Sequence, residues 1–224
     1  MSDLTHTEAS TPRERFRAQI RDEVKQVALR QLAQLGPAGV SVNAIGKELG
    51  VSGPALYRYF ASRDDLLTEL VIDAYDDLAA ALRDTNVRTK KRAPRRRFEA
   101  FAQAYRSWAN AQPHRYRLLY GPPLPGYDAH ARRLVNASEA VMDALIEVLP
   151  RSDEGSQPSK ALASQVSDWA SDRNVHADAP TAVCALLVWS RVHGFVSLEI
   201  DGNYASMGID PDSLFEIELS SLAA

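Results

Sequence analysis

The stretch from Ser41 to Phe60 constrains the fold most, because it predicts two short helices joined by a tight turn. Apolar residues at helical spacing predict a first helix over about 42–49: Val42, Ile45 and Leu49. Ser41 is a favourable N-cap for this helix. Gly50 follows where a helix ends most easily, since glycine adopts the left-handed conformation at little steric cost.

The second helix of this unit begins at Ser52, whose hydroxyl can cap the new N-terminus. Pro54 is tolerated in a first turn, where the amides have no partner within the helix. Leu56 and Phe60 lie one helical turn apart, so we expect both in the core. Gly46 falls on the inner side of the first helix, where a missing side chain lets the two helices cross closely. The pattern predicts a helix-turn-helix.

The outer face of the second helix carries small residues, tyrosines and a cation: Gly53, Pro54, Ala55, Tyr57, Arg58 and Tyr59. Small side chains let a helix approach base edges, and tyrosine hydroxyls and backbone amides at a helix start hydrogen-bond phosphates. The face therefore suits a DNA groove. The alternative is an ordinary helical hairpin whose tyrosines are half-buried surface residues.

The sequence Ser62-Arg63-Asp64-Asp65 next forms a capping box that opens a long amphipathic helix, from Arg63 to about Asp84. Arg63 lies where the N-terminus of this helix can add a phosphate contact. The helix is too long for the small N-terminal unit alone. We interpret it as the connector to a larger C-terminal body.

Taken in order, these motifs resemble the N-terminal DNA-binding domain of TetR/AcrR-family transcriptional regulators, over about residues 14–84. The resemblance implies that Ser41 caps the first helix and that Arg63 clamps a phosphate. It also implies a set of recognition-helix contacts: Ser52, Gly53, Pro54, Tyr57 and Tyr59. Two residues depart from the family pattern, since Gly46 stands where alanine is usual and Arg63 where lysine is usual.

Charge is distributed unevenly along the 224 residues, whose net charge is −3. The segment from Arg13 to Arg63 contains nine cationic and four anionic residues, whereas the segment from Lys160 to the end contains three cationic and nine anionic residues. A basic N-terminal part and an acidic C-terminal part suit a protein that contacts phosphates with one end. The single cysteine, Cys184, excludes an intrachain disulfide. We find no long apolar run and no secretory signal, so we expect a cytoplasmic protein and no membrane contact.

The chain divides by composition into four segments: a polar arm over 1–12, a helix-turn-helix domain over 13–62, the connector helix over 63–84 and a helical domain over 85–224. The expected fold class is therefore all-α. A run of cations from Arg88 to Arg97 is either a solvated linker and helix start or an additional phosphate contact, and the sequence leaves both open.

The C-terminal domain contains two helices, about 161–174 and 180–200, in which small residues recur. Small side chains permit close helix packing, so we expect this pair to form a four-helix dimer interface with a second copy. The sequence from Trp189 to Gly194 resembles the Trp/His/Gly signature of one C-terminal domain type in the same family.

Aromatic residues in this domain predict an effector pocket, with histidines as polar handles: Tyr105, Trp108, Tyr116, Tyr120, Tyr127, Trp169, Trp189, His193 and His114. A cavity with such walls suits a largely apolar effector. For any single aromatic, ordinary core packing is the competing interpretation.

The resemblance implies a homodimeric transcriptional regulator, most often a repressor in this family, that a small-molecule effector releases from a palindromic double-stranded DNA operator. Pairing two recognition helices on a palindrome increases both affinity and discrimination. The alternative is an effector-independent or nucleoid-type DNA-binding protein. An enzyme is not expected, because the sequence lacks metal-ligand pairs, a glycine-rich phosphate loop and a nucleophile motif, and neither a cofactor nor a metal is expected.

Overall fold

The structure is a computed structural model that describes residues 11–121, 132–149, 158–172, 175 and 177–222. Every regular element in these ranges is a helix, which confirms the all-α prediction. Tyr127 and the first ten residues of the predicted arm lie outside the described residues. The chain separates into two compact units, the first ending at Leu70 and the second starting at Val71.

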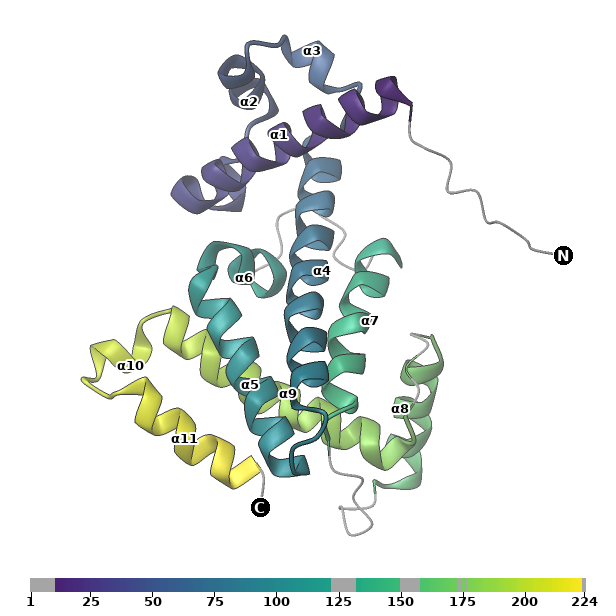
Figure 1. Cartoon of the computed structure of the whole chain (residues 1–224), viewed down its shortest axis with the longest axis vertical. Coiled ribbons are helices and arrows are strands. Elements are labelled where there is room, and N and C mark those ends of the chain that lie inside the picture. Colours follow the sequence, from purple (N-terminus) through teal and green to yellow (C-terminus); the bar gives the residue numbers. More distant parts are fainter. Residues whose placement is uncertain (1–10, 122–131, 150–157, 173–174, 176, 223–224) are drawn as a thin grey trace, which may run out of the picture. The chain divides into compact units, whose positions relative to one another are not determined.

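Unit 1 contains α1 (Pro12–Leu35), the short 3-10 helix η1 (Pro37–Gly39), α2 (Val42–Leu49), α3 (Gly53–Leu56) and the start of α4 (Arg63–Thr89). These elements are labelled in Figure 1. Their apolar faces meet in one small core: Val24, Val27, Ala28, Leu32, Val40, Val42, Ile45, Leu56, Phe60, Leu66, Leu67 and Leu70. Helices α1, α2 and α3 and the start of α4 therefore share one core.

Helix α2 has the predicted bounds because each of its ends is fixed locally. At its start the Ser41 hydroxyl accepts a hydrogen bond from the Ala44 amide at 3.3 Å. At its end Gly50 has φ +69°, the left-handed conformation that glycine adopts without steric cost. The Val51 amide then donates to the Gly46 carbonyl at 2.9 Å, so the chain turns tightly toward α3.

Gly46 occupies the close approach that its position predicts. A Cβ atom there would lie 2.9 Å from the Val51 carbonyl oxygen and 3.4 Å from a methyl carbon of Leu56. The turn and α3 therefore pack directly on the backbone of α2.

Helix α3 is a single turn, and its cap differs from the prediction. Ser52 has the extended backbone of an N-cap, but its hydroxyl makes no capping hydrogen bond. The reason is local: Pro54 has no N–H, and the Ala55 amide donates to the Ser52 carbonyl at 2.9 Å. Leu56 and Phe60 are 1% and 2% exposed, which confirms that both point into the core.

Unit 2 contains the rest of α4 and seven further helices: α5 (Pro94–Ala111), α6 (Pro113–Tyr120), α7 (Arg132–Ile146), α8 (Lys160–Asp172), α9 (Ala179–Ile200), α10 (Asn203–Ser206) and α11 (Pro211–Leu222). Helix α9 is central, because it contacts α5, α7, α8, α10 and α11. Figure 1 shows it crossing behind α5 and α7.

Helix α4 ends at Thr89, beyond the predicted 84, and therefore includes the start of the cationic run. Arg88 pairs with Asp84 one turn earlier in α4, and Arg95 pairs with Glu99 at 3.0 Å on the first turns of α5. These cations of the run thus bind carboxylates of unit 2.

Helix α9 is long and apolar enough to cross a membrane by length and composition alone, with a mean hydropathy of 1.4 over its most apolar window. Of the helices that the structure describes, it is the one that meets this criterion, and our expectation that no such segment exists was wrong on that point. The cause is its composition, since Arg191 and Glu199 are its only charged residues. Within the chain, 33% of that window is buried.

Candidate functional site

The outer side of α3 and of the turn after it presents the residues proposed to meet DNA. Tyr57 is 49% exposed, Arg58 is exposed, and Tyr59 is partly buried. Ser52 and Pro54 are exposed at the start of α3. Gly53 and Ala55 are partly buried beside them. The predicted contact residues from 52 to 59 therefore lie together on one surface.

Two arginines of α1 hold this surface by its backbone. Arg17 donates to the Arg58 carbonyl at 3.3 Å, and Arg21 donates to the Tyr59 carbonyl. Arg21 also pairs with Glu69 of α4 at 3.1 Å, and its guanidinium carbon lies 4.4 Å from the centre of the Phe60 ring. Arg21 thus joins α1, the turn after α3 and α4.

Arg63, the predicted phosphate clamp, is engaged with unit 1 itself. Its Nε donates to the Val40 carbonyl at 2.9 Å and its Nη2 to the Pro37 carbonyl at 2.6 Å. These bonds fasten η1 and the residue after it to the start of α4. A guanidinium has five N–H donors, so a phosphate contact by Arg63 would use the remaining ones.

The start of α4 has the predicted cap in modified form. The Ser62 hydroxyl accepts from the Asp65 amide at 3.0 Å, as a capping box requires. The Asp65 carboxylate, however, accepts from the Ala61 amide at 3.0 Å, one residue before the cap.

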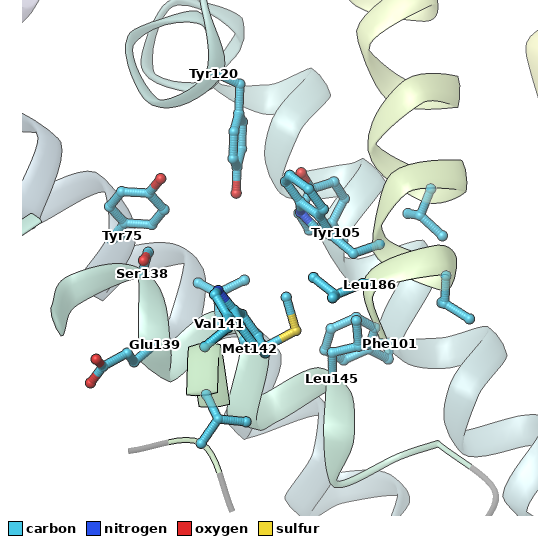
Figure 2. A pocket seen from close by; sticks show the side chains of 15 residues that line it. Tyr75, Phe101, Tyr105, Tyr120, Ser138, Glu139, Val141, Met142, Leu145 and Leu186 are labelled. Carbon is cyan, nitrogen blue, oxygen red and sulfur yellow. The ribbon is translucent and has the colours of Figure 1, made fainter. Parts of the chain in front are cut away.

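Unit 2 contains a partly open cavity of about 310 Å³. Helices α4 to α9 contribute its lining, which includes four of the predicted pocket residues: Tyr105, Tyr120, Trp169 and Trp189. Figure 2 shows tyrosines on one side of it and the apolar side chains of Val141, Met142 and Leu145 opposite. The volume is at the lower end of the range of about 300–1,000 Å³ for small-molecule sites.

Tyr116 and His193 lie behind this wall rather than in it. The Tyr116 hydroxyl lies 2.8 Å from His193 Nδ1, and the His193 ring stacks on Trp189 with centres 5.2 Å apart. Tyr116 also packs against Tyr120, with ring centres 5.1 Å apart. Burial raises the pKa of Tyr116 to about 12 and lowers the pKa of His193 below its usual value. Both groups are therefore uncharged at neutral pH and support the aromatic wall.

Trp108 and His114 are also outside the lining of the cavity. The Trp108 indole donates to Asp77 of α4 at 2.8 Å. Gln112 and Arg115 donate to the same carboxylate at 3.1 and 3.0 Å. Trp108 thus helps to fasten α4 to α5.

The other eleven lining residues were not predicted from the sequence, among them Tyr75, Ser138, Glu139 and Met142. Tyr75 was detectable in principle, because it sits beside Ala74 and Leu78 of the apolar stripe of α4. Ser138 and Glu139 gave no signal, because polar residues on α7 look like an ordinary solvent-facing side.

The Tyr105 hydroxyl differs from the other polar groups of the wall. Tyr105 is 2% exposed, and its hydroxyl has no hydrogen-bond partner among the described residues. Burial, and to a lesser extent the neighbouring Tyr120 and Tyr116, raise the pKa of Tyr105 well above its usual value. The hydroxyl therefore remains protonated and can donate a hydrogen bond.

No group of three or more His, Cys, Asp or Glu side chains that could hold a metal ion occurs in the part of the chain that the structure describes. Cys184 is partly buried on α9, and burial raises the pKa of its thiol.

A helix-turn-helix with an exposed outer face, joined by one helix to a helical unit with an apolar cavity, defines a class of two-unit DNA-binding regulators. Residues 26–70 match the family model described as "Bacterial regulatory proteins, tetR family", and residues 98–222 match "Tetracyclin repressor-like, C-terminal domain". The chain belongs to the TetR family of DNA-binding transcriptional regulators, as the sequence predicted.

Named relatives and solved structures agree with this assignment. The chain is 33% identical over 219 residues to the HTH-type transcriptional regulators Rv1816 of Mycobacterium tuberculosis and Mb1846 of Mycobacterium bovis, covering 93% of this chain and 92% of each relative. Its structure is similar to the crystal structure of the putative regulatory protein SCO4313, with a TM-score of 0.80 and 37% sequence identity. The match covers 95% of this chain and 98% of that chain. The structure of a protein of unknown function from Rhodococcus sp. RHA1 shares the fold, with a TM-score of 0.68 and 23% identity. The match covers 98% of this chain and 97% of that chain.

Proposed function

We propose that the protein is a homodimeric repressor that binds a palindromic operator in the cytoplasm and leaves it when a small molecule enters the cavity of unit 2. The outer face of α3 and its turn would read the operator, and α8 and α9 would join two copies.

The observation that carries the proposal is the exposed, backbone-held surface at residues 52–59. Tyr57 and Arg58 offer a hydroxyl and a cation to phosphates, and Gly53 and Pro54 leave room for base edges. Because Arg17 and Arg21 bind the carbonyls of this turn, its side chains are presented in a fixed arrangement.

The uncovered face of α9 supports a dimer. Leu187 and Leu198 are 62% and 47% exposed, and a Cβ atom at Gly194 between them would meet nothing within 4 Å. Leu162 of α8 is 40% exposed. Removing such apolar surface from water contributes roughly 25 cal/mol per Å². A second copy, expected for a symmetric reader of a palindrome, would cover this face.

The cavity supports control by a ligand, because Tyr75 of its wall belongs to α4, the helix that begins in unit 1. A ligand releases DNA only if its affinity is higher for the form of the protein that does not fit the operator than for the form that fits it. The effector would therefore act by shifting α4 between two arrangements.

Selection of tight-binding duplexes from a random pool with purified protein tests this function. We expect an inverted repeat whose half-sites are about one helical turn or a multiple apart, bound roughly a thousandfold or more tightly than random DNA. Affinity that varied little with sequence would instead indicate an effector-independent, nucleoid-type protein.

A pair of variants then tests the surface. Tyr57→Ala and Arg58→Ala should each weaken binding to the selected operator by about tenfold, which corresponds to about 1.4 kcal/mol. The matched control is Arg117→Ala, which removes an exposed arginine of unit 2 and should leave the affinity unchanged. Equal losses in the variants and the control would contradict the assigned surface.

A further inference from the structure

From the chemistry of the cavity wall we infer that the effector is an uncharged molecule with an apolar body and a hydrogen-bond acceptor oxygen, such as a carbonyl, that binds the Tyr105 hydroxyl. This inference rests on the proposed effector site and defines the ligand class of that site.

The wall is chemically divided. In Figure 2 the hydroxyls of Tyr75, Tyr105 and Tyr120 face a common space. Tyr75 and Tyr120 meet edge to face, with ring centres 6.2 Å apart. Val141 and Met142 lie on the opposite side. A ligand that fits both sides has an apolar body and one polar end.

The polar end must satisfy a hydroxyl that the protein leaves without a partner. A buried hydroxyl without a hydrogen bond costs roughly 1–3 kcal/mol, so a ligand atom that pairs with it is favoured over one that does not. The Tyr105 hydroxyl is buried, protonated and without a partner in the described residues. An acceptor oxygen matches this donor.

The charges of the wall argue against an anion. Among the described lining residues, the only charged side chain is that of Glu139. A ligand carboxylate would lose its hydration without gaining a cation. His193 behind the wall has a pKa lowered by burial, so it supplies no positive charge at neutral pH.

A cationic ligand is the closest competitor, because aromatic faces and a carboxylate attract cations. Glu139, however, is partly exposed, and Figure 2 shows its carboxylate directed away from the three tyrosines. A cation placed against Glu139 would leave the Tyr105 hydroxyl without a partner. The uncharged acceptor is therefore the better match for the buried end of the cavity.

Three probes with similar alkyl tails, about nine or ten carbons long, separate these classes: undecan-2-one, decanoate and decylammonium. Trp169 and Trp189 line the cavity, so the quenching of tryptophan fluorescence in the purified full-length protein reports occupancy. We expect the ketone to bind most tightly. Tyr105→Phe should weaken ketone binding about fivefold, the effect of one neutral hydrogen bond.

Tyr204→Phe is the matched control, because it also removes one tyrosine hydroxyl of unit 2, but one on α10 that is outside the lining. It should leave ketone affinity unchanged. Tighter binding of decylammonium that Glu139→Gln abolishes would overturn the inference, as would tighter binding of decanoate. Equal ketone affinity in the wild type and Tyr105→Phe would also overturn it.

Thermal melting of each variant verifies that it folds, and operator binding without probe tests the proposed function separately. If the ketone binds as expected but does not release operator DNA, effector control fails while the ligand class stands. If the operator is bound but no probe prefers wild type over Tyr105→Phe, the ligand class fails while DNA binding stands.

Discussion

The same substitution, tyrosine to phenylalanine, should have opposite effects on stability at two neighbouring positions. Tyr105 and Tyr116 are both 2% exposed, and their rings meet edge to face with centres 6.3 Å apart. The Tyr116 hydroxyl contacts His193 Nδ1 at 2.8 Å, whereas the Tyr105 hydroxyl has no hydrogen-bond partner among the described residues. The two positions thus differ in hydrogen bonding and hardly at all in burial.

The magnitudes follow from this difference. Tyr116→Phe removes a hydrogen bond and leaves the partly buried imidazole of His193 without this partner, which should lower the free energy of unfolding by about 1–1.5 kcal/mol. Tyr105→Phe removes a buried donor that has no protein partner, which should raise the free energy of unfolding by about 1 kcal/mol. For a chain of this size, each kcal/mol corresponds to a change in Tm of roughly 2–4 °C.

Thermal and urea unfolding of wild type and both variants, without ligand and at one protein concentration, measure these changes. The concentration must be constant because the unfolding of a dimer depends on it. The two variants should differ from each other by about 2 kcal/mol. If Tyr105→Phe were destabilised as much as Tyr116→Phe, the hydroxyl of Tyr105 would have a partner, and the reasoning about the cavity would fail.

Three further changes test how the fold is held. Arg106→Met should lower the free energy of unfolding by about 2–3 kcal/mol, because it leaves the partly buried Glu199 without its cation and without two hydrogen bonds of 2.7 Å. Urea unfolding should show that Glu199→Met in the same chain restores part of the loss. Asp77→Asn should lower stability at neutral pH. Burial opposes ionisation of Asp77, but hydrogen bonds from Trp108 and other donors outweigh it and hold the pKa of Asp77 below 3.8. The stabilisation by Asp77 is complete above about pH 3.8 and is lost as the pH falls through the lowered pKa of its carboxyl. The difference in urea midpoint between wild type and Asp77→Asn should therefore disappear in acid. A difference that stayed constant with pH would refute this explanation. Gly50→Ala should cost about 1 kcal/mol, measured by thermal unfolding, because φ is +69° and no atom within 4 Å would offset the strain.

Local features of the fold were predictable because their causes lie within a few residues. The bounds of α2 follow from Ser41 at one end and Gly50 at the other. The Ser52 hydroxyl shows the limit of such rules. It is a favourable capping group, yet Pro54 supplies no N–H and Ala55 donates elsewhere, so the hydroxyl makes no capping bond.

Distant contacts were not predictable in the same way. From the sequence alone, Arg21 is only one of the positive charges between Arg13 and Arg63. Its partners Tyr59 and Glu69 lie far along the chain, and their approach depends on the tertiary packing. The cavity shows the same limit. Composition indicated an aromatic pocket, but whether Tyr120 or Tyr116 faces it depends on how α6 is rotated against α9.

The hydrogen bonds from α1 to the turn after α3 influence how such a protein can change the DNA sequence that it binds. Arg17 and Arg21 bind peptide oxygens, which every amino acid supplies, rather than the side chains of Arg58 and Tyr59. Residues at these positions can therefore be exchanged while the turn keeps its place. Descendants of such a chain could acquire new operators through a few substitutions on a scaffold that stays the same.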